Sequence, residues 1–282
     1  GVANAVWYDG KWHDEQPRIL GPLDHAFWMA SVVFAGARSF SRMAPDLDLH
    51  SARVVRSAES LLLRPDMTAE EIETLSREGI RRFADDAELY VRPMFFAMSG
   101  FVVPDPASTH FALAIQEVPM PRPTGMSVRL SRYRRPTPDS APTEAKASCL
   151  YPNMQRALAE VRAEGFDNAV TLDANGNVAE LASANLWMVK NGVAMTPVAN
   201  GTFLAGITRA RVLALLRQDG IEAVEATLTP RDLEQADELF STGNWGKVLP
   251  ITRYGARELP AGPVARRARG LYMAFARPQK GG

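Results

Sequence analysis

Six of the chain's twenty prolines fall in one short stretch, and this cluster limits what the surrounding residues can form. They occupy positions 119, 121, 123, 136, 138 and 142. A proline has no backbone N–H, so it breaks a hydrogen bond inside a helix or a central strand. We therefore expect the cluster to separate two parts of the chain. The predicted organisation is a small α/β domain over 1–120, an interdomain segment over 121–142 and a larger domain over 143–282.

The residues before the cluster have the patterns of both strands and helices. They predict a hairpin over 3–13, helices over 50–63 and 68–84, and strands over 89–98 and 110–117. Thr68 and Glu71 have the spacing of a capping box, which opens the second helix. Pro93 falls inside a predicted strand, so we expect a bulge or an edge position there.

Within and after the cluster, turn residues alternate with short apolar runs. Strands are predicted over 126–130, 169–173, 178–181, 186–190, 224–228, 239–241 and 247–252, and helices over 148–164, 207–218 and 264–276. Asn175–Gly176 and Asn191–Gly192 supply turns between strands. The two parts together predict an α+β chain of mixed α/β content.

The charge and cysteine content exclude several classes of partner. Basic and acidic residues balance at 32 each in 282 residues, whereas a nucleic-acid-binding protein usually has a basic excess. No apolar run approaches the ~20 residues that cross a bilayer, and the first residues do not resemble a signal peptide. Cys149 is the only cysteine, so no intramolecular disulfide can form. We expect a cytoplasmic protein that binds neither nucleic acid nor membranes.

The histidines do not suggest a metal site. His25, His50 and His110 have no partner at the spacing of zinc ligands, and there is no cysteine cluster. The sequence therefore predicts no metal.

Lys146 stands between the proline cluster and a predicted helix. By itself, a lysine in this position is a solvated surface residue. Its interpretation changes because of the motifs that begin with it and follow it. In chain order these are Lys146–Tyr151, Asp173–Trp187, Thr196–Pro197, Leu204–Arg209, Ala236–Phe240 and Ser241–Gly243.

In the order and spacing of these motifs, the chain resembles the class IV aminotransferases, also called fold type IV pyridoxal-phosphate enzymes. Their best-known members are the branched-chain amino acid aminotransferases, and the resemblance extends from Val33 to about Ile251. It implies a two-domain fold of the D-amino acid aminotransferase type, with pyridoxal 5'-phosphate bound in the larger C-terminal domain. It also implies an active site at the domain junction and a homodimer or higher homo-oligomer.

The resemblance assigns roles that suit the chemistry of the matched residues. Lys146 matches the lysine that forms an imine with the cofactor aldehyde and then moves the substrate's α-proton. Glu180 matches the glutamate that keeps the pyridine nitrogen protonated. Tyr151 matches the tyrosine that contacts the ring oxygen.

The cofactor phosphate needs positive charge and free N–H groups. Gly206 and Thr208 lie at the start of a predicted helix, whose first turn offers unpaired donors. By resemblance Arg53 clamps the phosphate, and Asn244 replaces a threonine of the family and donates through its amide. The cofactor-binding residues implied by the resemblance are Arg53, Lys146, Tyr151, Glu180, Leu204, Gly206, Ile207, Thr208 and Asn244.

Departures from the family's pattern concentrate at the expected substrate pocket. Met29 replaces an active-site tyrosine, Ala35 replaces a glutamate, and Trp245 replaces an alanine and should crowd the pocket beside the cofactor. Tyr90 and Arg92 match the branched-chain pattern. The substrate-pocket residues implied by the resemblance are Met29, Phe34, Arg38, Tyr90, Arg92 and Trp245.

The resemblance implies a transaminase that moves an amino group from an amino acid or amine to a 2-oxo acid by a ping-pong mechanism, as the branched-chain enzymes do. The departures leave three alternatives open. These are an (R)-selective amine transaminase, a D-amino acid transaminase and a lyase of the aminodeoxychorismate lyase type. A lyase would turn over a single substrate, whereas a transaminase needs a donor and an acceptor.

Four arginines precede Lys146, at positions 129, 132, 134 and 135. One interpretation is a solvated basic strand and loop. The other is that one guanidinium pairs with a substrate carboxylate, for which its planar fork is suited.

Overall fold

The structure is a computed structural model that describes residues 2–278, and it divides into two compact units. Unit one contains the residues up to Met120 together with Glu144–Leu150, and unit two contains Pro121–Thr143 and Tyr151–Phe275. Lys146 thus groups with unit one and the proline-rich segment with unit two. The predicted domains, 1–120 and 143–282 with an interdomain segment over 121–142, stay a prediction.

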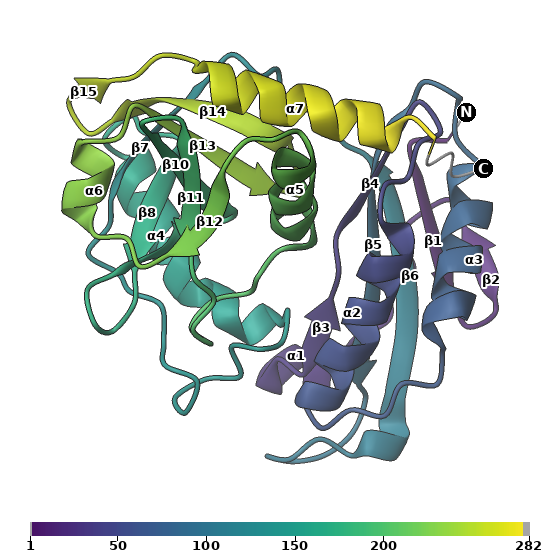
Figure 1. Ribbon diagram of the computed structural model, residues 1–282. Coiled ribbons are helices and arrows are strands. Elements are labelled where there is room, and N and C mark those ends of the chain that lie inside the picture. Colours follow the sequence, from purple (N-terminus) through teal and green to yellow (C-terminus); the bar gives the residue numbers. More distant parts are fainter. Residues whose placement is uncertain (1, 279–282) are drawn as a thin grey trace. The chain divides into compact units, whose positions relative to one another are not determined.

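The described part of unit one forms a six-stranded antiparallel sheet in the order β2-β1-β6-β5-β3, with β4 also paired to β5. The strands are β1 (Asn4–Tyr8), β2 (Lys11–His13), β3 (Val32–Phe34), β4 (Ala37–Phe40), β5 (Glu88–Ala97) and β6 (Thr109–Glu117). Helices α2 (Leu47–Ser60) and α3 (Ala69–Ile80) lie side by side on one face of this sheet (Figure 1). The short helices are α1 (His25–Met29), η1 (Pro106–Ser108) and η2 (Ser148–Leu150).

The core of unit one lies between the sheet and α2 and α3. Val91 and Phe95 of β5 point to the helices, and they pack in one cluster with Val54 of α2 and Ile72 of α3. Since strand residues alternate between faces, the even-numbered residues of β5 point to the opposite face. That open face carries several of the predicted substrate residues. The capping box of Thr68 and Glu71 is confirmed at the start of α3.

The prediction for Pro93 was wrong. β5 is an interior strand, with β6 on one side and β3 and β4 on the other, and its register with β6 is continuous through Pro93. Pro93 lies opposite the break between β3 and β4, where its carbonyl accepts a hydrogen bond from Ala35 N at 3.1 Å. An interior strand tolerates the proline because the missing N–H falls at that break.

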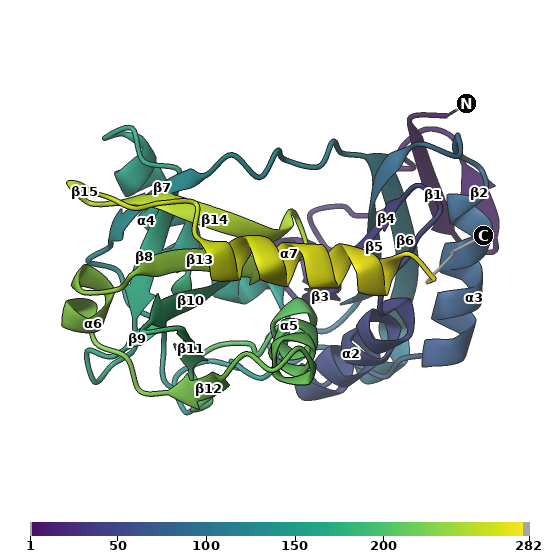
Figure 2. The same ribbon diagram turned by 45° about the horizontal axis from the view of Figure 1, so that its top comes forward.

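The described part of unit two forms a nine-stranded mixed sheet in the order β12-β11-β10-β13-β14-β7-β8-β9, with β15 paired to β14. The strands are β7 (Met126–Leu130), β8 (Asn168–Leu172), β9 (Val178–Leu181), β10 (Asn185–Lys190), β11 (Val193–Pro197), β12 (Ala223–Ala226), β13 (Glu238–Gly243), β14 (Lys247–Tyr254) and β15 (Arg257–Glu258). The helices are α4 (Tyr151–Arg162), α5 (Ile207–Gln218), α6 (Pro230–Glu234) and α7 (Pro263–Ala276). α7 runs along β14 in both ribbon views (Figures 1 and 2), and Arg269 donates to the Val248 carbonyl at 2.7 Å.

The centre of the unit two sheet is held by β10 and β13. Trp187 and Phe240 are paired in register and their rings stack with centroids 5.4 Å apart. The indole Nε1 of Trp187 donates to Thr242 Oγ1 at 2.9 Å, so the buried N–H is satisfied. This pairing fixes the ends of both strands, where Asn185 and Gly243 lie.

Most long elements were predicted from the sequence, and the short ones were missed. α5 and β9 have the predicted bounds, and the predicted helix over 148–164 is η2 followed by α4. The missed elements are α1, β3, β4, η1, β11, α6 and β15. Each spans at most five residues, too few for a period of apolar residues to be recognised.

Among the described residues, no helix is both long and apolar enough to cross a bilayer. The same residues contain no group of three or more His, Cys, Asp and Glu side chains that could hold a metal ion.

Candidate active site

Lys146 is held at the edge of the unit one sheet by its backbone. Its N–H donates to Ser57 Oγ of α2 at 3.0 Å, and its carbonyl accepts from Phe34 N of β3 at 3.1 Å. The next residue, Ala147, forms an antiparallel bridge with Val33. The backbone of a residue in a proline-rich loop is thereby fixed on two sides.

Phe34 lies against the Lys146 side chain. The Nζ atom of Lys146 is 5.1 Å from the centroid of the Phe34 ring. An ammonium over an aromatic face is stabilised by the ring quadrupole, and the ring also shields one side of the amine from water. The structure therefore brings together the predicted catalytic lysine and one predicted substrate residue.

Arg53 lies on α2 one turn before Ser57, and residues four apart on a helix share a face. Both side chains are buried. The predicted phosphate clamp is therefore on the same face of α2 as the hydroxyl that holds the Lys146 backbone.

Tyr90 and Arg92 of β5 point to the open face of the unit one sheet. The guanidinium carbon of Arg92 lies 5.5 Å from the centroid of the Tyr90 ring, and Arg92 lines a cavity of about 1040 Å³ on that face. Phe34 pairs with Met94 in register, so it belongs to the same face. Three predicted substrate residues thus share one surface.

Arg38 and Met29 have different surroundings. The Arg38 side chain is fully buried and donates to the carbonyl oxygens of Val118 at 2.5 Å and Pro119 at 3.4 Å. Burial lowers the pKa of Arg38 from its ordinary value. Met29 is the last residue of α1 and is exposed. Arg38 therefore ties β4 to the end of the unit, whereas Met29 lies at its surface.

In unit two, Asn185 links the predicted ring-nitrogen partner to the predicted phosphate site. Its Nδ2 donates to Glu180 Oε2 at 3.3 Å and to the Leu204 carbonyl at 3.2 Å, and its Oδ1 accepts from Gly206 N at 3.1 Å. A Cβ on Gly206 would lie 2.4 Å from Asn185 Oδ1, so glycine is required for this approach. Asn185 lies within the Asp173–Trp187 motif, but the resemblance assigned no role to it.

Glu180 is held from a second side by Arg135. Oε1 of Glu180 lies 3.5 Å from Nε of Arg135, and both side chains are mostly buried. The same Nε donates to the Thr202 carbonyl at 3.1 Å. A buried cation beside a carboxylate favours its ionised form. The contact between Arg135 and Glu180 was not predicted from the sequence.

The remaining three arginines make other contacts. Arg129 pairs with Glu164 and lies 3.6 Å from Glu160, and Arg132 Nε donates to Glu160 at 2.6 Å. Arg134 donates to the Ala174 carbonyl at 3.2 Å. Two of these guanidiniums thus bind carboxylates of the chain itself, at or just beyond α4.

The N-terminus of α5 has no side-chain cap. Gly206 is its N-cap residue, and the N–H groups of the first turn have no acceptor within the helix. Thr208, in the first turn, is buried. Unpaired donors and the helix dipole make this end favourable for an anion. Tyr151, by comparison, is the first residue of α4 and is partly exposed.

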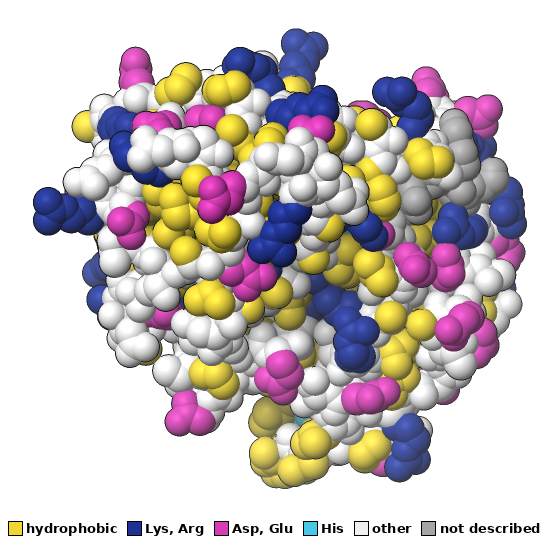
Figure 3. Space-filling view, viewed as in Figure 1, with side chains coloured by type: hydrophobic (Ala, Val, Ile, Leu, Met, Phe, Trp, Pro, Cys, Tyr) yellow, Lys and Arg dark blue, Asp and Glu magenta, His cyan; other side chains and the backbone are white. Residues whose placement is uncertain are grey.

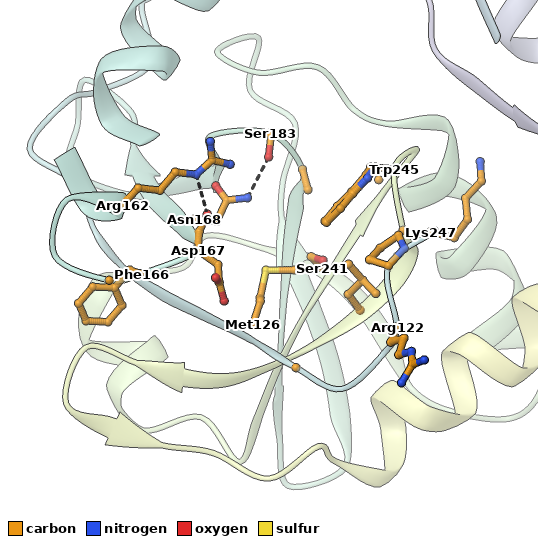
Figure 4. A pocket seen from close by; sticks show the side chains of 17 residues that line it. Arg122, Met126, Arg162, Phe166, Asp167, Asn168, Ser183, Ser241, Trp245 and Lys247 are labelled. Atoms are coloured by element: carbon orange, nitrogen blue, oxygen red, sulfur yellow. Dashed lines mark hydrogen bonds between the residues drawn. The ribbon is translucent and has the colours of Figure 1, made fainter. Parts of the chain in front are cut away.

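Asn244, Trp245 and Gly246 form the hairpin loop between β13 and β14. The loop begins two residues after Thr242, which pairs in register with Asn185. Asn185 in turn accepts a hydrogen bond from Gly206 at the N-terminus of α5. The Nδ2 atom of Asn244 is buried and has no hydrogen-bond acceptor among the described residues. Trp245 is 55% exposed and borders a cavity of about 700 Å³ (Figure 4).

This cavity lies on one side of the unit two sheet. It is bordered by polar groups at one end, where Asn168 donates to Ser183 and Arg162 donates to the carbonyl of Asp167 (Figure 4). Met126, Ser241 and Trp245 border the rest. The Trp245 indole, which was expected to crowd the substrate pocket, borders an open cavity and is not buried in the core.

Comparison with known proteins identifies the family. The model of the family described as "Amino-transferase class IV" matches residues 32–254. The chain therefore belongs to the class IV aminotransferases. It is 32% identical over 261 residues to the putative branched-chain-amino-acid aminotransferase of Methanocaldococcus jannaschii, a match that covers 89% of this chain and 88% of the relative. Against the branched-chain-amino-acid aminotransferase of Escherichia coli K12 it is 28% identical over 283 residues, covering 94% and 90%.

Solved structures give the same result. An aminotransferase from Brucella abortus bound to the co-factor PLP is 47% identical, with a TM-score of 0.96 over 98% of this chain and 99% of that one. The branched-chain aminotransferase from Thermoproteus uzoniensis with norvaline is 29% identical, with a TM-score of 0.90 over 98% and 95%. The predicted fold type IV architecture, of mixed helices and sheets, is confirmed. The roles of the individual site residues stay predictions.

Proposed function

We propose that the chain is a pyridoxal-phosphate-dependent aminotransferase that moves an amino group from an amino acid to a 2-oxo acid, as the branched-chain aminotransferases do. The observation that carries this proposal is the position of Lys146. A lysine in a loop is held by its backbone between β3 and α2, with its amine over the Phe34 ring. The names of the curated relatives support the branched-chain assignment.

The residues of unit two suit the phosphate of this cofactor. The uncapped first turn of α5 offers N–H groups, and the buried Nδ2 of Asn244 is a donor without an acceptor among residues 2–278. Buried donors are normally satisfied, so both features favour an anionic ligand. Arg53 of α2 and Thr208 would add a guanidinium and a hydroxyl.

When bound, pyridoxal phosphate supplies an aldehyde that condenses with amines and a ring that accepts electrons from the substrate's α-carbon. The residues of the chain do the rest. Lys146 would hold the cofactor through its Nζ atom, and its amine would serve as the base that takes the proton from the substrate's α-carbon. The Phe34 ring beside Nζ limits the access of water to that amine.

Glu180 would hold the proton on the ring nitrogen. Its carboxylate is fixed by Asn185 and lies beside Arg135, so it is held in one orientation. A fixed anion at this position would stabilise the protonated ring of the cofactor. Tyr151 and Leu204 complete the proposed cofactor site.

For the substrate we propose branched-chain L-amino acids and their 2-oxo acids. Tyr90, Arg92 and Phe34 share the open face of unit one and retain the branched-chain pattern. Trp245, Arg38 and Met29 are the remaining proposed pocket residues. (R)-amines, D-amino acids and a lyase substrate are the alternatives that activity measurements will distinguish.

We also propose a homodimer. Apolar side chains gather on the surface over α1 and the segment between β5 and β6 (Figure 3). Among them, Leu23 is 91% and Phe101 77% exposed. An exposed apolar patch of this kind marks an interaction site, and a second copy of the chain is the proposed occupant. The single cysteine accords with the predicted cytoplasmic location.

Lys146→Ala tests the function directly. The purified wild type should carry a visible absorption band from the bound cofactor, and L-leucine with no acceptor should remove it. Lys146→Ala should lose both the band and the turnover of L-leucine with 2-oxoglutarate. Lys190→Ala, at an exposed lysine, is the control and should keep both. A Lys146→Ala protein with wild-type turnover would overturn the proposal.

A panel of donors resolves the substrate class. L-leucine, L-glutamate, D-alanine and (R)-1-phenylethylamine are each tested for loss of the absorption band. The branched-chain proposal requires L-leucine to be among the best donors. Faster reaction of D-alanine or (R)-1-phenylethylamine would instead support one of the alternatives, and turnover of aminodeoxychorismate with no acceptor would support a lyase.

A further inference from the structure

Lys247 occupies a position in the β13–β14 hairpin that is unfavourable for a lysine. It pairs with Gly243 in register, so Asn244, Trp245 and Gly246 form the loop between them. Its backbone has a φ of 63°, a left-handed conformation that costs a non-glycine residue about 1–2 kcal/mol. Strained positions of this kind cluster at ligand-binding sites.

The ammonium of Lys247 is buried, because only 1% of the residue is exposed. In the close view, the side chain extends away from Trp245 and from the cavity that the indole borders (Figure 4). Its Nζ lies 5.6 Å from the centroid of the Tyr272 ring of α7 and donates to Asn244 Oδ1 at 2.9 Å. A charged group is thus placed inside the loop that carries the proposed phosphate donor.

The contact with Lys247 determines how the Asn244 amide is oriented. An ammonium has only donors, so the amide atom that faces it must be the oxygen. The amide nitrogen then points to the other side, where the described residues supply no acceptor. A buried donor left without an acceptor costs about 1–3 kcal/mol, so the arrangement is favourable only when a ligand accepts that hydrogen bond.

We infer that Lys247 is a positioning residue for the cofactor phosphate. It holds Oδ1 of Asn244 so that Nδ2 donates to a phosphate oxygen, and its charge favours the bound dianion. A threonine hydroxyl could rotate to make the same bond without help, whereas an amide must be oriented. This inference rests on the proposed function, since it requires the phosphate of pyridoxal phosphate to lie at the loop.

The test separates the phosphate from the rest of the cofactor. Pyridoxal has the same aldehyde and ring as pyridoxal phosphate but lacks the phosphate. The dissociation constants of both are measured on the full chain, freed of cofactor, for the wild type and for Lys247→Met. We expect Lys247→Met to raise the constant for pyridoxal phosphate about tenfold and to leave that for pyridoxal within about twofold. The matched control, Lys190→Met at an exposed lysine, should change neither.

A second background tests the orientation itself. In Asn244→Thr, where the donor is a hydroxyl, Lys247→Met should raise the constant for pyridoxal phosphate by less than it does in the wild type. Equal losses for pyridoxal and pyridoxal phosphate would overturn the inference, because they would indicate a general loss of folding. A wild type that binds neither compound would overturn the proposed function instead.

Asn244→Asp provides a further measurement if Lys247→Met does not fold. An aspartate pairs with Lys247 but has no donor for the phosphate, so binding of pyridoxal phosphate should fall at least tenfold while binding of pyridoxal is kept. Wild-type affinity of Asn244→Asp for pyridoxal phosphate would show that this side chain does not face the phosphate, and the inference would fail.

Discussion

Asn185 donates a hydrogen bond of 3.3 Å from its Nδ2 to Oε2 of Glu180. Its other amide atom accepts from Gly206 N at the start of α5. One side chain therefore connects the proposed ring-nitrogen partner to the proposed phosphate site. Both contacts lie within unit two, so the proposed ring-nitrogen partner and the proposed phosphate site are connected inside that unit.

Asn185→Ala should impair turnover more than folding. It removes a hydrogen bond to a charged group, worth about 1.5–3 kcal/mol, so we expect kcat/KM to fall roughly ten- to one-hundred-fold. Steady-state kinetics with L-leucine and 2-oxoglutarate measure the effect. Asn175→Ala, at an exposed turn asparagine, is the matched control and should behave as the wild type. Unchanged kinetics in Asn185→Ala would contradict this role.

Gly206→Ala should break the same connection from the other side. The added methyl group would lie 2.4 Å from Asn185 Oδ1, so the amide must move. We expect a loss of kcat/KM similar to that of Asn185→Ala. In the Asn185→Ala background the clash is absent, so the double variant should be little worse than either single one. Additive losses would indicate that the two residues act separately.

Ser57→Ala should loosen the attachment of Lys146. The Lys146 N–H would lose its acceptor at 3.0 Å, and an unsatisfied buried donor costs about 1–3 kcal/mol. We expect the free energy of unfolding in urea to fall by about that amount and kcat to fall with it. Ser60→Ala is a control on the same helix, because the Ser60 hydroxyl bonds to the Arg56 carbonyl one turn back. If both variants lost equal stability, the contact with Lys146 would not be the cause.

Cys149 should react slowly with alkylating reagents at neutral pH. Cys149 is exposed, but partial desolvation of its thiol raises the pKa above the ordinary value, so the reactive thiolate is scarcer than in the unfolded chain. The alkylation rate with iodoacetamide should therefore rise with pH through a midpoint higher than that of the chain unfolded in urea. Rates measured from pH 6 to 11 for both states test the direction. A native midpoint at or below the unfolded one would refute it.

The long elements could be predicted from the sequence because their signals are local. The helix over 207–218 follows from its apolar period and its closing Gly220, and the capping box of Thr68 and Glu71 is a property of four consecutive residues. The family could be recognised because its motifs are contiguous in the chain, as in the run from Asp173 to Trp187. Pro93 was misjudged because its effect depends on which strands lie beside it.

The sequence by itself determined the family, the major elements and the residue types at the site, since these depend on neighbours in the chain and on the order of motifs. Only the tertiary structure decided that Asn185 holds Glu180, that Arg135 is buried against the same carboxylate, and that Ser57 receives the Lys146 N–H. Hydrogen bonds and ion pairs act over a few ångströms, and the residues that make these contacts lie 5, 45 and 89 positions apart in the chain. Apolar periodicity cannot report which polar atoms will meet after the strands have paired.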